Sequence, residues 1–382
     1  MEAIKRLPIK DACEKLVGWV KINNRELMIK EGWQVDFRPL LPRFMRVMAL
    51  TFGVFLIVGL IGKSPVHAEE FTIVVGPTGT PALSTYHAVE ALKYRAEKYS
   101  KGRIKVEIHH SGSMGSDKKL LESVTQGTLD VAYTSNGNYA HVGKAMLPFD
   151  LPYLVYGRQN DFNLVTGALR DEVSERVAKD GLKYLMMFPI GGPRQIFNSR
   201  QELKTPADAK GIKMRVVASP INQAVYGGYG FQLVVMPWSE VYTGLKQGII
   251  EGLFSNALWS YQYKHTEVAK HITMTGGVGI WHIGVMNLDR YNAMPADLQA
   301  AFDRASTEAE MVGHMYDLYL SDKGSRGAVD NHDAKIYHPT KAELQQWMDP
   351  ALALWDPLIE KLNLDRDFIK RIQDAQIPVE DY

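Results

Sequence analysis

One guanidinium stands out as a side chain that could hold an anion. Arg215 lies in the run IKMRVV (212–217), whose apolar positions alternate as they do on one face of a β-strand. Arg215 then projects from the opposite face, together with Lys213. A planar guanidinium binds a carboxylate through two parallel hydrogen bonds, which a lysine cannot do. The spacing alone favours a ligand carboxylate and a structural ion pair equally, so both interpretations stay open at this point.

The elements that must position this side chain form an α/β half-domain. Residues 210–256 read as a strand, a helix ending in glycines, the apolar strand QLVVM, a helix capped by Ser239, and a last short strand. In an open α/β sheet, ligands bind at the carboxyl ends of the strands. The side chains at or near such ends are those of Arg215, Trp238, Ser255 and Asn256.

The same stretch resembles the solute-binding proteins of tripartite ATP-independent periplasmic (TRAP) transporters, the DctP-like family. The matching text is KGxKxR at 210–215, followed by PxSEVYxxLxQGxxEG at 237–252. The sequence then departs from the family, because Ser255-Asn256-Ala257 stands where many members have an Asn-Pro pair. The polar contact expected there could come from Ser255, from Asn256 or from neither.

The resemblance implies a fold and roles for particular residues. The implied fold is α/β and two-lobed, of the periplasmic binding protein type (type II-like), with a long helix that spans both lobes. By this resemblance Arg215 holds the ligand carboxylate, and Arg194 in GPRQ matches a second arginine that some members use. Trp238 matches an aromatic residue that borders the ligand, although burial in a core would suit a tryptophan equally well.

The half of the chain before residue 140 has a similar organisation. Strand patterns over 71–75, 103–109 and 129–134 alternate with helical patterns over 84–99 and 117–126, which predicts a parallel sheet. The motif QGxx followed by an acid occurs in both halves, and a Ser-Asn pair follows each copy. We therefore expect two similar lobes facing one cleft, unless the motif is only a common glycine helix end. The polar candidates that this half adds are Thr78, Ser135 and Asn136.

These patterns divide the chain into four parts. The lobes are joined near Gly191-Gly192 and around Gly276 to Trp281, where glycines allow the backbone to bend. A long helical pattern begins at Asp297 and continues to about Asp322. The expected parts are an N-terminal extension with a signal peptide (1–68), lobe 1 (69–191 with about 282–320), lobe 2 (192–281 with about 321–340) and a C-terminal helical segment (341–382).

The N-terminal part predicts export. An uncharged run of 16 residues (47–62) follows two arginines and precedes Val66-His67-Ala68, a pattern typical of a secretory signal cleaved after Ala68. The alternative is a membrane anchor, which needs about 20 apolar residues. Such signals usually start at the N-terminus, so Met45 or Met48 could be the initiator. We assign no function to residues 1–44, which contain Cys13, the one cysteine of the chain.

Charge and motifs disfavour other classes of function. Residues 1–68 hold 11 Lys/Arg and 6 Asp/Glu of the chain's 44 and 43, which leaves 33 and 37 and a net charge of −4 in the mature chain. No basic tract indicates nucleic acid. The histidines lack metal-ligand spacing, and no phosphate loop or GxSxG motif occurs. We therefore expect no catalytic residue, no metal and no cofactor.

The prediction for function is a periplasmic solute-binding protein of a Gram-negative bacterium. It would act as a monomer, capture a small organic anion, and deliver it to the small and large membrane subunits of a TRAP transporter, as the resemblance implies. Two alternatives remain, since a fold does not fix a function. They are an exported enzyme on the same scaffold and the ligand-sensing subunit of a receptor.

Overall fold

The computed structural model describes residues 70–155 and 169–377, together with Gly157, Asn160, Leu164 and Gly167. These residues belong to one structural unit, Val66–Tyr382. The predicted extension and signal peptide (1–68) lie outside the described residues, as do the last five residues of the C-terminal segment. No helix in the described part of the chain is both long and apolar enough to cross a membrane.

The first sheet contains the predicted β-α-β-α-β run. Its strands β1 (Phe71–Pro77), β2 (Ile104–Ile108) and β3 (Val131–Ser135) are parallel, because α3 (Ser84–Tyr99) and α4 (Asp117–Thr125) carry the chain back between them. Two strands from later in the chain, β4 (Leu182–Pro189) and β10 (Trp281–Asn287), extend the sheet, and β10 pairs antiparallel with both β3 and β4. The order is β2-β1-β3-β10-β4.

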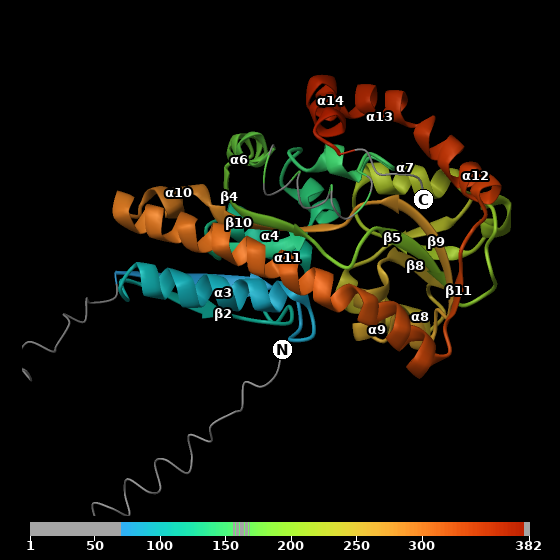
Figure 1. The fold of residues 1–382 in the computed structure, drawn as a ribbon, viewed down its shortest axis with the longest axis horizontal. Coiled ribbons are helices and arrows are strands. Elements are labelled where there is room, and N and C mark those ends of the chain that lie inside the picture. The colour runs from blue at the N-terminus through green and yellow to red at the C-terminus, as the bar shows by residue number, and fades with distance from the viewer. Residues whose placement is uncertain are drawn as a thin grey trace, which may run out of the picture. The chain divides into compact units, whose positions relative to one another are not determined.

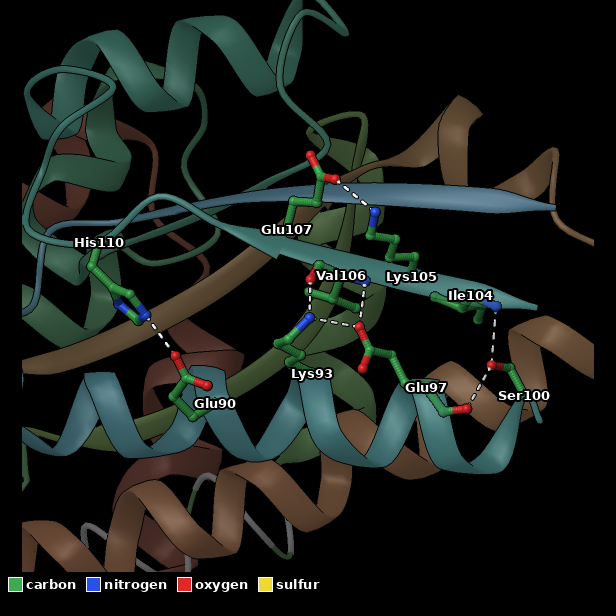
Figure 2. Close-up of polar contacts among 9 residues, drawn as sticks. All are labelled: Glu90, Lys93, Glu97, Ser100, Ile104, Lys105, Val106, Glu107 and His110. Atoms are coloured by element: carbon green, nitrogen blue, oxygen red, sulfur yellow. Dashed lines mark hydrogen bonds and ion pairs between the residues drawn. The ribbon is translucent and has the colours of Figure 1, made fainter. Parts of the chain in front are cut away.

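Side chains from α3 cover the free edge of β2 (Figure 2). Glu97 Oε1 accepts the N–H of Val106 at 3.1 Å, and Lys93 Nζ donates to the carbonyl of the same residue at 2.6 Å. Ser100 Oγ accepts the N–H of Ile104 at 3.0 Å. An edge strand otherwise exposes unpaired backbone groups that another chain could pair with. The polar face of α3 therefore protects this edge while its apolar face packs on the sheet.

The second sheet repeats this topology. Strands β6 (Lys213–Val216), β7 (Gln232–Val235) and β8 (Gly252–Ser255) are parallel and connected by α7 (Pro220–Gly228) and α8 (Val241–Lys246). Three further strands, β5 (Arg194–Asn198), β9 (His271–Val278) and β11 (Lys335–Tyr337), complete the order β11-β9-β5-β8-β6-β7. The run β7-β6-β8-β5 thus corresponds to β2-β1-β3-β10.

The repeated QGxx-acid motif has the same role in both halves. The two motif glycines have φ values of 72° and 70°, the left-handed conformation that commonly ends a helix. Asp130 Oδ2 accepts the N–H of Val74 in β1 at 2.7 Å. Glu251 Oε2 accepts the N–H of Lys213 in β6 at 3.0 Å. Each acid therefore fixes the first of the three parallel strands of its sheet, which lies between the other two.

The predicted helix cap at Ser239 is wrong. Residues Trp238–Glu240 form a short 3₁₀ turn, η5, and α8 begins only after it. Glu240 takes the N-cap position without a side-chain hydrogen bond. The serine lies inside the turn, one residue too early to reach the free N–H groups of the helix.

Two short connections, after β4 and after β9, form the crossings between the sheets, and a long helix between β10 and β11 carries the chain across a third time (Figure 1). This helix, α11 (Ala296–His332), extends ten residues beyond its predicted end. On the side of the first sheet, Glu310 Oε1 accepts the N–H of Met187 in β4 at 2.7 Å. On the side of the second sheet, a Cβ on Gly324 would lie 2.3 Å from the backbone of Leu258 in α9 (Ala257–Gln262), so only glycine permits this packing.

The C-terminal segment also contacts both halves. It forms α12 (Lys341–Leu352), α13 (Trp355–Leu362) and α14 (Arg366–Asp374). Trp347 Nε1 donates to the carbonyl of Lys204, which precedes β6, at 2.9 Å. Arg371 pairs with Glu172 of α6 (Arg170–Lys179), which precedes β4, at 2.7 Å.

Candidate ligand-binding site

A cavity of about 40 Å³ is lined by residues of both sheets and of the loops at their strand ends. Most of the side chains that the sequence singles out meet here, although they come from segments far apart in the chain. The predicted residues in the lining are Thr78, Ser135, Arg194, Arg215, Trp238, Ser255 and Asn256.

Arg215 reaches the cavity from strand β6 and is only 2% exposed. Its Nε donates to the carbonyl of Met236 at 3.0 Å, which fixes the plane of the guanidinium. No described residue accepts a hydrogen bond from its two terminal nitrogens. Burial and the charge of Arg194 lower the pKa of Arg215 to about 9, against the opposing effect of Asp117. The side chain is therefore still positively charged at neutral pH.

Arg194 is the first residue of β5 and is 4% exposed. One terminal nitrogen donates to the carbonyl of Phe254 at 3.4 Å. Its Nε and its other terminal nitrogen are buried without an acceptor. Within the described residues, neither Arg194 nor Arg215 forms an ion pair with a carboxylate. Two buried cations facing one cavity favour an anion there, because an unpaired buried charge is costly.

Aromatic rings form one wall of the cavity. Trp238 is half-buried, and its ring lies 5.4 Å from the guanidinium carbon of Arg215. Trp259 packs edge-on against Trp238 with a centroid distance of 5.8 Å, and His265 does so at 4.6 Å. The tryptophan is therefore part of the cavity rather than of a closed core, and the wall offers apolar surface beside the cationic groups.

Both histidines near this wall are neutral. Burial, followed by the charge of Arg194, lowers the pKa of His282 to about 3. Its Nδ1 lies 2.8 Å from Oγ1 of Thr85. Burial, followed by the charge of Arg215, lowers the pKa of His265 to about 3. The two arginines are thus the cations of the cavity at neutral pH.

In the Ser-Asn pairs, the serine and the asparagine have different roles. Ser135 and Ser255 line the cavity, and the Ser255 hydroxyl makes no hydrogen bond to a described residue. Asn256 also reaches the lining, but its amide is used elsewhere. Its Oδ1 accepts the N–H of Trp259 at 2.9 Å, and its Nδ2 donates to the carbonyl of Ile190 at 2.6 Å. Of this pair, Ser255 is the residue free to contact a ligand.

Asn136, which was predicted as a ligand contact, is not among the residues that line this cavity. Its Nδ2 donates to Asp150 at 2.7 Å, and its Oδ1 accepts the N–H of Trp281 at 3.2 Å. Trp281 follows the second crossing, as Ile190 precedes the Gly191 turn of the first. The two asparagines therefore hold the two crossings.

Sequence reasoning missed several residues of the lining. Asp117 opens α4, where an acid is common for helix stability alone. The glycine turn GxxG that precedes Asp117 brings this residue to the same sheet edge as Thr78. Asp117 could therefore have been predicted from this turn. No comparable sequence pattern indicated Asn138, Trp259 and His282, which also line the cavity. Among the described residues, no three His, Cys, Asp or Glu side chains come together as a metal site requires.

Comparison with known proteins gives one family match. The model of the bacterial extracellular solute-binding proteins, family 7, matches residues 76–362. A solute-binding protein of Verminephrobacter eiseniae is 29% identical over 249 residues, which cover 65% of this chain and 70% of that protein. The 2,3-diketo-L-gulonate-binding periplasmic protein of Escherichia coli is 27% identical over 267 residues, covering 69% and 80%.

A similar fold occurs among solved structures. A TRAP periplasmic solute-binding protein from Chromohalobacter salexigens, solved with bound D-glucuronate, superposes with a TM-score of 0.75 at 19% identity. The match covers 80% of this chain and all of that one. The predicted two-lobed α/β fold is confirmed by this likeness and by the two sheets.

Proposed function

Because this chain belongs to the family 7 bacterial extracellular solute-binding proteins, which serve TRAP transporters, we propose that it captures a small organic acid between its two sheets. Arg215 holds the carboxylate of this acid through its two free terminal nitrogens. Arg194 contributes a second positive charge, Trp238 covers apolar carbon atoms, and the hydroxyls of Ser135 and Ser255 contact polar groups.

One observation carries this proposal. Arg194 and Arg215 are both buried, both line the same cavity, and neither has a carboxylate partner among the described residues. Hydrogen bonds to charged groups contribute about 1.5 to 3 kcal/mol each, so an incoming carboxylate gains substantially from this arrangement. Two similar proteins support the class of ligand, since one is named for 2,3-diketo-L-gulonate and the other holds D-glucuronate.

The family is extracytoplasmic, and its TRAP members work with membrane components. Beyond this, we propose that the protein acts as a monomer in the periplasm of a Gram-negative bacterium. It delivers its ligand to the small and large TRAP membrane subunits and binds no nucleic acid. We further propose that it is not an enzyme, because His282 in the cavity lining and His265 beside Trp238 have pKa values near 3, too low for a base at neutral pH.

Titration calorimetry with small organic acids and their neutral primary amides tests the proposal. We expect an acid to bind at least about tenfold more tightly than the amide of the same carbon skeleton, because the amide lacks the charge that Arg194 and Arg215 require. Mass spectrometry of molecules that co-purify with the protein identifies the natural acid. Equal affinity for acids and amides, or no binding of any acid, contradicts the proposal. Turnover of the bound acid would favour the enzyme alternative.

A further inference from the structure

A carboxylate faces the two arginines from the other sheet. Asp117 is the first residue of α4, which belongs to the first sheet, whereas Arg194 and Arg215 lie on β5 and β6 of the second. Its side chain lines the same cavity as both arginines, although the residue is only 8% exposed. A ligand between the sheets therefore meets cations on one side and an acid on the other.

Side chains of other described residues donate to only one oxygen of Asp117, and its own backbone N–H also donates to the carboxylate. Thr134 Oγ1 donates to Oδ1 at 3.0 Å, and Thr78 Oγ1 makes a longer contact with the same atom at 3.5 Å. No side chain of another described residue donates to Oδ2.

We propose that Asp117 makes the site selective for acids that carry a hydroxyl at the end away from the bound carboxylate, over acids with a second carboxylate there. This selectivity rests on the proposed function, because it needs the first carboxylate to bind the arginines. A hydroxyl donates to an ionised Asp117 and accepts from a protonated one, so it suits both states. A second carboxylate only accepts, and it is repelled by an ionised Asp117.

The serine hydroxyls and the neutral histidine of the cavity do not make this distinction. The hydroxyls of Ser135 and Ser255 both donate and accept, so they suit a hydroxyl and a carboxylate equally. His282 is neutral and adds no charge. Burial raises the pKa of Asp117, while the hydrogen bond from Thr134 and the charge of Arg215 oppose that rise. Of the residues in the described lining, Asp117 is the acid that would repel a second carboxylate.

Matched acids test the selectivity in the unmodified protein. We would measure 4-hydroxybutyrate against succinate and 5-hydroxypentanoate against glutarate by titration calorimetry at neutral pH. Each pair has one chain length and differs only in the group at the far end. We expect the hydroxy acid of at least one pair to bind about tenfold or more tightly than the diacid. A diacid that binds as tightly as its hydroxy partner in both pairs overturns the inference.

Two variants show which residue is responsible. Asp117→Asn removes the charge, retains the shape and keeps an acceptor for Thr134, so the preference should fall toward equality, mainly through tighter binding of the diacid. Asp171→Asn is the control, because Asp171 is an exposed acid in the first turn of α6 and is no part of the cavity lining. It should leave the preference unchanged.

The outcomes separate this inference from the proposed function. An unchanged preference in a folded Asp117→Asn protein removes Asp117 from the selectivity, while binding of acids still supports the proposed function. If Asp117→Asn does not fold, the two pairs measured on the unmodified protein still decide the inference. Failure of every acid to bind overturns the proposed function and the selectivity with it.

Discussion

A single backbone contact orients the Arg215 side chain before a carboxylate binds. The bond from Nε to the carbonyl of Met236 fixes the guanidinium plane, and strand β6 fixes the stem, so the terminal nitrogens need little reordering when a ligand arrives. A lysine at this position would retain the positive charge but lose both the planar fork and the bond to Met236.

Arg215→Lys should therefore weaken acid binding by roughly 1.5 to 3 kcal/mol, which is about ten- to a hundred-fold or more in the dissociation constant. The melting temperature should change little, because no carboxylate of the described residues loses a partner. Calorimetry and a thermal melt measure the two effects, with Arg200→Lys on the exposed ion pair to Glu251 as control. An unchanged dissociation constant with a lowered melting temperature would mean that Arg215 is structural.

The pKa of His265 links stability to pH. In the folded protein burial lowers it to about 3, whereas the ordinary value is 6.5. Below pH 6.5 the unfolded chain binds a proton that the folded protein excludes. The stability from this difference is complete above pH 6.5 and is lost as the pH falls toward 3.

We expect His265 to lower the free energy of unfolding by about 2 kcal/mol between pH 7.5 and pH 5, at about 1.4 kcal/mol per pH unit below 6.5. Denaturant unfolding at a series of pH values measures this slope. In His265→Gln the slope below pH 6.5 should be smaller by one proton. An identical slope in both proteins would show that His265 also takes up its proton in the folded state.

The two crossings depend on particular side chains of neighbouring elements. Asn256 caps α9 and also binds the carbonyl of Ile190, so it connects the second sheet to the first crossing. Asn136 binds the N–H of Trp281 at the start of β10, at the second crossing. These two residues follow β8 and β3, which occupy equivalent places in the two sheets.

Asn256→Ala should destabilise the protein by about 2 to 4 kcal/mol, because it removes an N-cap and leaves a buried carbonyl without a donor. It should also weaken ligand binding, since the crossing beside the cavity loses its support. Asn287→Ala is a matched control. Asn287 caps α10 (Leu288–Asn292) and binds the carbonyl of Val124 at 2.9 Å, away from the cavity lining.

The two variants should differ in binding and not in stability alone. Urea unfolding gives the stability of each, and calorimetry gives its affinity for the same acid. Asn287→Ala should lose stability while keeping its affinity. Equal affinities in both variants would limit Asn256 to a role in folding.

At the scale of the whole molecule, the ligand is expected to act as a link between the two sheets. Arg194 and Arg215 belong to one sheet, while Ser135 belongs to the other and Asp117 begins α4, which connects two strands of that other sheet. A ligand that contacts both sets binds more tightly when the sheets are close, and it shifts the population toward that state by its difference in affinity. The crossings are short enough to act as hinges.

Small-angle scattering should therefore show a smaller radius of gyration when the protein is saturated with its acid. The neutral amide of the same acid, at the same concentration, should leave the radius unchanged because it does not engage the arginines. Equal radii with and without the acid at saturation would contradict ligand-driven closure.

Features set by local patterns were predictable from the sequence. Alternation over 212–217 and 71–75 predicts strands because the side chains of a strand have a period of two, and the helix over 84–99 follows equally from its spacing. The family motif placed Arg215 at the end of such a strand. The last ten residues of α11 were not predicted, because their buried face contains small residues, Gly324 and Ala328, rather than an apolar stripe.

The sequence by itself determined the two α/β halves, the strand that carries Arg215 and the class of protein. Tertiary structure decided which polar side chains are free to bind. Asn136 and Asn256 look like ligand contacts in the sequence, yet the crossings occupy their amides. His282 lies beside Thr85, which is 197 positions earlier in the chain, and no local sequence pattern predicts that contact. The hydrophobic periodicity of a segment shows only which of its side chains face water and which face the core. The partner of a buried polar group depends on which distant segments the fold brings together.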